Sequence, residues 1–152
     1  MSGEQIDEKR KLRLYKKLKS RLVVEDYVLE LDRGKRRQLS MLRGGTNKLR
    51  IEIGRWRGEK VEERVCDVCL TTDVEDEKHF LLYCPMYVRE RVEMFERIRE
   101  ETEIGDIERW EEISILRVLI GVEGRKEGRK VRSIVLDYMR KAYEIRSRYV
   151  TY

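Results

Sequence analysis

Three cysteines and one histidine lie close together near the middle of this 152-residue chain, which contains no others of either type. Their spacing is CxxC, nine residues, His, four residues and Cys, which gives Cys66, Cys69, His79 and Cys84. Zinc prefers thiolate and imidazole ligands, and a CxxC turn can present two sulfurs to one ion. The spacing therefore predicts a CCHC metal site with Zn²⁺ as the cofactor. Four protein ligands would leave no open position for water, which argues against zinc hydrolysis.

The second pair of ligands must be turned back toward the first. Residues 72–75 (TDVE) fit a capping box and predict a short helix over 74–83, which would carry His79. Cys84 follows five residues later, about 140° around an ideal helix, so a continuous helix would not aim both side chains at one ion. Pro85 disfavours the α conformation at Cys84 and so allows that side chain to turn toward His79.

Two other interpretations of these residues remain open. A CxxC motif can be a redox pair, although that motif normally opens a helix in a βαβ unit and nothing upstream of Cys66 has such a pattern. Alternatively, the cysteines are small buried apolar residues and His79 is a hydrogen-bonded core histidine.

Residues 64–91 read RVCDVCLTTDVEDEKHFLLYCPMYVRER and resemble the zinc-binding segment that follows the reverse transcriptase of non-LTR (LINE-type) retrotransposons. The likeness rests on CxxC, the acidic run VEDE, then HFLL, CP, an aromatic residue and an arginine. Residues 39–64 resemble the arginine-rich lead-in of that family, and residues 11–19 and 134–146 resemble it more weakly. One departure is Leu70, at a position where such knuckles often carry glycine.

The resemblance implies an accessory domain that binds RNA or DNA while a polymerase elsewhere copies. It also makes a reverse transcriptase body a candidate partner. The polymerase itself is not expected in this chain, because no two aspartates are adjacent and the aromatic-x-Asp-Asp signature is therefore missing.

Positive charge is concentrated at the two ends of the chain. Residues 1–43 carry 13 basic and 7 acidic side chains, residues 122–152 carry 9 and 4, and the residues between them are net acidic. Eight cations fall within thirteen residues with no acid among them, and they are Lys9, Arg10, Lys11, Arg13, Lys16, Lys17, Lys19 and Arg21. We expect this run to contact phosphates with low sequence specificity. The alternative is a solvated helix face that keeps the protein soluble.

Several arginines near the predicted zinc site are further candidates for phosphate contact. Arg55 and Arg57 flank Trp56, and Arg89 and Arg91 follow the last cysteine. Trp56 could stack on a base, but with only two tryptophans in the chain we expect it to anchor the core.

Apolar residues recur at intervals of three and four along most of the chain, which predicts a mainly α fold, a helical domain with a small zinc-binding knuckle inserted. We expect one domain with a basic helical segment at 1–45, a zinc-binding segment at 46–86 and a helical segment at 87–152. Expected helices are 11–22, 24–31, 35–42, a short one within 46–56, 88–102, 107–120 and 131–149. Val88, Val92, Phe95 and Ile98 mark the expected buried face of the helix at 88–102.

Catalysis finds little support in the sequence. The only histidine belongs to the metal site, and the acidic runs at 73–77 and 100–112 are typical of solvated helix faces. We therefore expect no enzyme activity and no small-molecule substrate. A second candidate function is a structural or protein-interaction module, in which the helix around Trp110 docks onto a polymerase or a second copy.

No apolar run is long enough to span a bilayer, and the first residues do not resemble a signal peptide. We expect an intracellular protein, nuclear or cytoplasmic, without a membrane partner.

Overall fold

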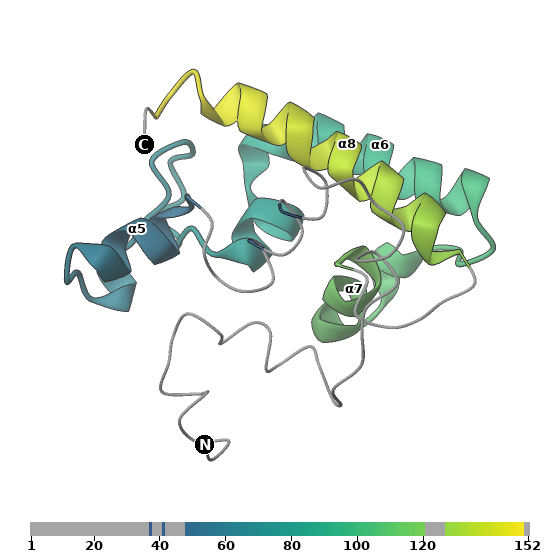
Figure 1. Cartoon of the computed structure of the whole chain (residues 1–152), viewed down its shortest axis with the longest axis horizontal. Coiled ribbons are helices and arrows are strands. Elements are labelled where there is room, and N and C mark those ends of the chain that lie inside the picture. Colours follow the sequence, from purple (N-terminus) through teal and green to yellow (C-terminus); the bar gives the residue numbers. More distant parts are fainter. Residues whose placement is uncertain (1–36, 38–40, 42–47, 121–126, 151–152) are drawn as a thin grey trace, which may run out of the picture.

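The computed structural model describes residues 37, 41, 48–120 and 127–150 (Figure 1). Its helices are α5 (Arg50–Trp56), α6 (Val88–Glu101), α7 (Glu112–Leu119) and α8 (Gly128–Arg146), numbered as in Figure 1. Short turns of 3-10 helix lie at Val61–Glu63, Pro85–Tyr87 and Ile107–Arg109, and a π-helical turn spans His79–Tyr83. Among the described residues, β pairing is limited to an isolated antiparallel bridge between Val65 and Val74. The predicted mainly α fold is confirmed.

The two longest of the described helices, α6 and α8, pack side by side and form the main body of this part of the fold (Figure 1). Met94 and Ile98 of α6 and Ile134 and Met139 of α8 are all buried in the core. The predicted helix at 131–149 therefore exists, although α8 begins at Gly128 and ends at Arg146.

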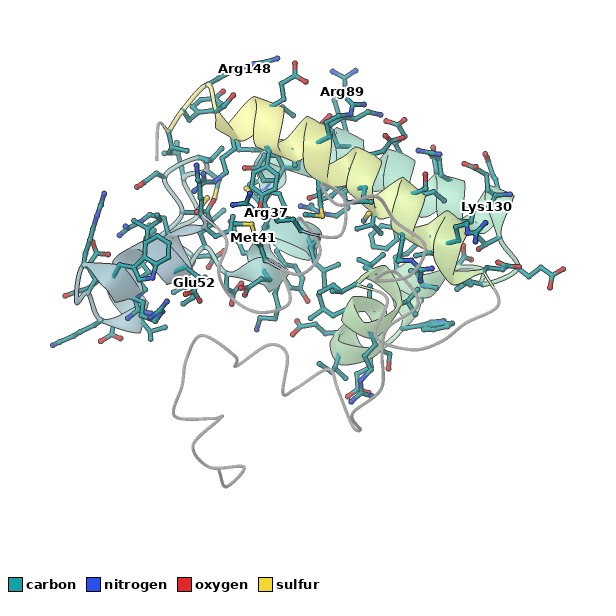
Figure 2. The ribbon with its side chains drawn as sticks, in the orientation of Figure 1. Arg37, Met41, Glu52, Arg89, Lys130 and Arg148 are labelled. Atoms are coloured by element: carbon teal, nitrogen blue, oxygen red, sulfur yellow. The ribbon has the colours of Figure 1, made fainter. Side chains whose placement is uncertain are left out.

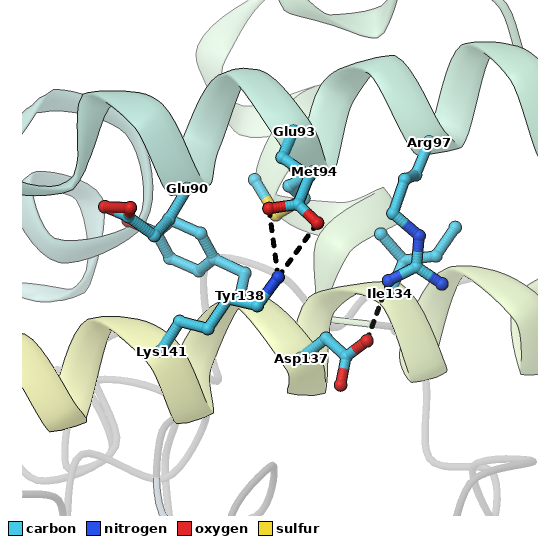
Figure 3. A pocket seen from close by; sticks show the side chains of 8 residues that line it. All are labelled: Glu90, Glu93, Met94, Arg97, Ile134, Asp137, Tyr138 and Lys141. Atoms are coloured by element: carbon cyan, nitrogen blue, oxygen red, sulfur yellow. Dashed lines mark hydrogen bonds and ion pairs between the residues drawn. The ribbon is translucent and has the colours of Figure 1, made fainter.

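Two ion pairs bridge α6 and α8 across a shallow groove near the surface (Figure 3). Lys141 Nζ lies 2.8 Å from a carboxylate oxygen of Glu93, and Arg97 lies 2.8 Å from Asp137. Exposed pairs of this kind contribute little stability, typically about 0.2–1 kcal/mol each, so the buried apolar side chains must hold the helices together.

The expected buried face of α6 is only partly confirmed, because Ile98 lies in the core and Phe95 packs against it, but Val88 and Val92 do not. Val88 and Val92 are 47% and 50% exposed, whereas Arg91, Met94 and Ile98 are buried. Residues 88, 92 and 95 and residues 91, 94 and 98 form two neighbouring stripes at helical spacing, and the core uses the second. Because the second stripe contains an arginine, its hydrophobic pattern does not predict that this stripe is buried.

The predicted helix at 107–120 is divided in the structure. Ile107–Arg109 forms one 3-10 turn, the backbone is extended at Trp110 and Glu111, and α7 begins only at Glu112. Leu116 and Leu119 of α7 are buried against the body of the domain.

A single core includes residues from Leu49 to Val150 and therefore joins α5, the cysteine-rich segment and α6–α8. No helix in the described part of the chain is long and apolar enough to cross a bilayer. The helices predicted at 11–22 and 24–31 lie outside the described residues. Only Arg37 and Met41 are described from the helix predicted at 35–42, and both are helical.

Candidate metal centre

The three cysteines and the histidine converge in the structure. Their ligand atoms all lie within 4.8 Å of one another, and all four residues are buried. Cys69 Sγ lies 3.4 Å from His79 Nε2. With Zn–S near 2.3 Å and Zn–N near 2.0–2.1 Å, neighbouring ligands of a tetrahedral ion are about 3.5–3.8 Å apart, so the four ligand atoms lie within about 1 Å of the separations that one such ion requires. The residues can hold a metal ion, and Nε2 is the imidazole atom that would bind it.

The first pair of ligands belongs to a loop whose two ends are tied together. The Cys66 amide donates a 2.9 Å hydrogen bond to the Asp73 carbonyl, beside the bridge between Val65 and Val74. Thr72 has φ of +64°, a left-handed conformation that is uncommon for a β-branched residue. The left-handed residue of this loop is therefore Thr72, two positions beyond Leu70.

His79 lies on a helical turn that begins later than predicted, and Cys84 follows the end of that turn. Val74 is in the β bridge, and the Asp76 carboxylate accepts a 2.9 Å hydrogen bond from the His79 amide, which caps the turn. The capping box predicted at 72–75 was wrong, because Thr72 lies in the loop and the Glu75 carboxylate is buried elsewhere.

Cys84 reaches the cluster by two features of the backbone. Its amide donates a 2.7 Å hydrogen bond to the carbonyl of His79, five residues earlier, so a widened π turn brings Cys84 back toward His79. Cys84 itself is extended, with φ −61° and ψ 121°, and Pro85 begins the next 3-10 turn. The predicted effect of Pro85 is confirmed, whereas the π turn has no signal in the sequence that we could have used.

A buried ion pair lies next to the first cysteine. Glu75 Oε2 is 3.8 Å from Cys66 Sγ, and both carboxylate oxygens of Glu75 accept hydrogen bonds from Arg146 at 2.8 and 2.9 Å. Glu75 also accepts from the Arg50 amide at 2.7 Å, and Arg146 donates to the Lys48 carbonyl at 3.1 Å. This network joins the metal centre to the start of α5 and to the end of α8.

A second buried arginine supports the other side of the centre. Arg91 donates hydrogen bonds to the carbonyl of Leu81 at 3.0 Å and to that of Cys84 at 2.8 Å. The expectation that Arg91 faces phosphate was therefore wrong, because its guanidinium fixes the turn that carries His79 and Cys84. Arg89 is exposed and points away from the helix pair (Figure 2).

The pKa values of Cys66, His79 and Cys84 are shifted by burial and by hydrogen bonds within the cluster. A hydrogen bond to Cys84 and burial raise the pKa of Cys66 to about 12, and the same hydrogen bond lowers the pKa of Cys84. Burial lowers the pKa of His79, but hydrogen bonds and charges of Cys66 and Cys69 outweigh it and raise the value to about 9. A metal ion bound here must displace these protons, as in other thiolate sites.

The residues predicted to bind nucleic acid are only partly described. The eight cations between Lys9 and Arg21 lie outside the described residues. Arg55 is held by the Glu52 carboxylate at 2.9 Å and lies 5.9 Å from the ring centre of Trp56, at the end of α5. Trp56 is 58% exposed, so the expectation that it anchors the core was wrong, and Arg57 is exposed beside it.

The four cysteine and histidine ligands are the one cluster of potential metal ligands in the described part of the chain. Within the acidic run at 73–77, Glu75 and Asp76 already accept the hydrogen bonds described above. Comparison of the whole chain with models of protein families, with curated proteins and with solved structures finds no match.

Proposed function

We propose that Cys66, Cys69, His79 and Cys84 bind one zinc ion, and that the protein is a zinc-braced accessory domain that binds RNA or DNA. The observation that carries the first half is the buried convergence of three sulfurs and one imidazole nitrogen within 4.8 Å. Three thiolates and one imidazole favour zinc over magnesium, calcium and other metals that prefer oxygen ligands.

Zinc would act here as a structural cross-link. It would join the loop that carries Cys66 and Cys69 to the turn that leads from His79 to Cys84. Because the protein fills all four positions, the ion has no site for a substrate or for water. The proposal therefore assigns no catalysis to this chain.

Support for nucleic-acid binding comes from charge and from the resemblance to the retrotransposon segment. The run at 9–21 has the density of positive charge that phosphate backbones attract. Three thiolates and a zinc ion together carry a charge of −1, so the metal centre itself does not attract phosphate. Its contribution is to fix the scaffold, which includes the exposed Arg57 and Trp56.

Anisotropy titrations with labelled single-stranded RNA, single-stranded DNA and duplex DNA test this proposal. Binding through several phosphates should weaken steeply between about 50 and 200 mM salt. Replacing Lys16, Lys17 and Lys19 by glutamine should weaken binding to all three ligands and reduce the salt slope by about 2–3. A matched triple variant at Lys130, Arg140 and Arg148, which are exposed on or beside α8, controls for net charge. Failure to bind at about 50 mM salt, or binding indifferent to salt, would contradict the proposal.

A second candidate function, a protein-interaction module, is favoured by a different observation. The helix after Trp110 does not offer the docking face that we expected, because Ile115, Leu116 and Leu119 are buried in the core. An apolar face is exposed on α6 instead, at Val88 and Val92. A polymerase body or another protein could dock there without any contact to nucleic acid.

A further inference from the structure

A threonine hydroxyl lies against one sulfur of the metal centre. Thr71 Oγ1 is 3.2 Å from Cys69 Sγ, two positions earlier in the same loop. Cys69 is buried, whereas Thr71 is exposed. The two atoms are close enough to form a hydrogen bond, and either of them can donate it while the sulfur carries a proton. The direction of this hydrogen bond therefore depends on the state of the sulfur.

A bound metal ion would set that direction. The Cys69 sulfur would bind the ion as a thiolate, which has no proton to donate, so the Thr71 hydroxyl would have to be the donor. His79 Nε2 also lies near this sulfur, at 3.4 Å. As a metal ligand, Nε2 would direct its lone pair at the ion and carry no proton. Of these two polar neighbours, only Thr71 can then donate to the thiolate.

The loop holds the Thr71 hydroxyl in the orientation that this requires. The Asp73 amide donates to Thr71 Oγ1 at 3.3 Å, which closes a short turn of the ST type. Thr72, between them, has the left-handed conformation that reverses the chain. Because the amide occupies one lone pair of the Thr71 oxygen, the hydroxyl proton remains available for the sulfur. The Asp73 carbonyl in turn accepts from the Cys66 amide at 2.9 Å, so both cysteines of the loop depend on this turn.

The other two sulfurs have different neighbours. Backbone hydrogen bonds of Val68 and Cys69 lower the pKa of Cys66, and one of Met86 lowers the pKa of Cys84. Cys66 Sγ also lies 3.8 Å from the Glu75 carboxylate. Among the hydrogen bonds of the described residues, a side-chain hydroxyl reaches a ligand sulfur at Cys69 alone. Thr71 is therefore specific to one of the three thiolates.

We propose that Thr71 is a positioning residue of the metal centre, whose hydroxyl donates a hydrogen bond to the Cys69 thiolate when the ion is bound. This inference rests on the metal site proposed above, and it needs no nucleic acid. A hydrogen bond to a charged acceptor is stronger than one between neutral groups, and partners of this kind orient metal ligands and raise metal affinity. The bond also disperses part of the charge of −1 that three thiolates and one zinc ion carry together.

Two substitutions at the same position separate the hydroxyl from the rest of the side chain. Thr71→Val removes the hydroxyl and keeps the branched shape, so it also hinders a water molecule from taking the place of the donor. Thr71→Ser keeps the hydroxyl and removes the methyl group. In competition titrations of the full chain with a zinc indicator, Thr71→Val should bind Zn²⁺ about tenfold more weakly than the parent, and Thr71→Ser within about twofold of it. Circular dichroism of the zinc-loaded variants verifies that the fold is retained.

A spectroscopic readout separates the hydrogen bond to sulfur from a loosened loop. Thr71→Val also removes the acceptor of the Asp73 amide, and the loss of that contact would lower affinity without any effect on the sulfur. With Co²⁺ in place of zinc, the sulfur-to-cobalt charge-transfer band reports on the electrons of the thiolates. Loss of a hydrogen bond raises the energy of the sulfur lone pairs, so this band should move to longer wavelength in Thr71→Val and stay in place in Thr71→Ser.

The outcomes distinguish this inference from the metal site on which it rests. A parent chain that binds neither Zn²⁺ nor Co²⁺ would refute the metal centre and the role of Thr71 with it. A parent chain that binds both ions, together with a Thr71→Val variant whose charge-transfer band is unshifted, would overturn the role of Thr71 and leave the metal centre in place. Equal losses of affinity in Thr71→Val and Thr71→Ser would also overturn it, because the hydroxyl would then have no effect of its own.

Discussion

Arg146→Met should lower the free energy of unfolding of the zinc-loaded protein by about 3–5 kcal/mol, because it leaves the Glu75 carboxylate buried without its counterion. The side chains of Arg146 and Glu75 are only 4% and 1% exposed, and two hydrogen bonds of 2.8 and 2.9 Å join them. The unpaired carboxylate would also lie 3.8 Å from Cys66 Sγ, which must become a thiolate to bind metal. We therefore expect zinc affinity to fall together with stability.

The matched control for this change is two residues away. Arg148 pairs with Glu144 at 3.9 Å, but their side chains are 67% and 63% exposed, so Arg148→Met should cost less than about 0.5 kcal/mol. A double variant, Arg146→Met with Glu75→Gln, removes the buried charge while it keeps an acceptor for the Arg50 amide. It should recover more than half of the loss.

The assay is denaturant unfolding followed by circular dichroism at a fixed excess of zinc, with a competition titration against a zinc indicator for affinity. Equal stability of Arg146→Met and Arg148→Met would refute the account of the buried network. A double variant no more stable than Arg146→Met would show that the unpaired charge of Glu75 does not cause the loss of stability.

Three further predictions concern Arg91, Gly54 and Trp56. Arg91→Leu leaves two buried carbonyls without donors and should lower stability by about 2–4 kcal/mol in thermal unfolding, whereas Arg89→Leu should change it by less than about 0.5 kcal/mol. Gly54→Ala should be destabilising by about 1–3 kcal/mol, because the new methyl group would lie 2.7 Å from Cδ of the buried Arg64; an unchanged melting temperature would contradict that packing. Trp56→Ala should leave stability nearly unchanged because the ring is mostly exposed, yet weaken binding of single-stranded RNA about fivefold or more if the ring stacks on a base.

The metal centre could be predicted because its signals are local in the sequence. The ligand set and spacing follow from the coordination chemistry of zinc, and the conformation of Cys84 follows from the proline after it. The helix start predicted at 72–75 was nevertheless wrong, because the last residue of the expected capping box forms a tertiary contact instead. Glu75 is used by Arg146, which is 71 residues away in the sequence, and no local pattern contains that pairing.

The remaining errors share a physical cause. Hydrophobicity alone assigned Val88 and Val92 to the core of α6 and Arg91 to the surface, whereas Arg91 is buried because it satisfies carbonyls of a separate segment. Trp56 was expected in the core as one of only two tryptophans, but α5 is short and buries Ile51 and Ile53 instead. When a side chain donates hydrogen bonds to another part of the chain, as Arg91 does, the hydrophobic pattern of its own helix does not predict that it is buried.

The most direct test of the central claim is native mass spectrometry of the protein expressed with zinc. We predict one zinc ion per chain, with chelation causing a loss of helical circular dichroism because binding and folding of such sites are coupled. Cys84→Ser should lose tightly bound zinc, while Ser133→Ala, an exposed change on α8, should retain it. A chain that carries no zinc, or a Cys84→Ser variant that holds one zinc as tightly as the parent, would contradict the four-ligand centre on which this account depends.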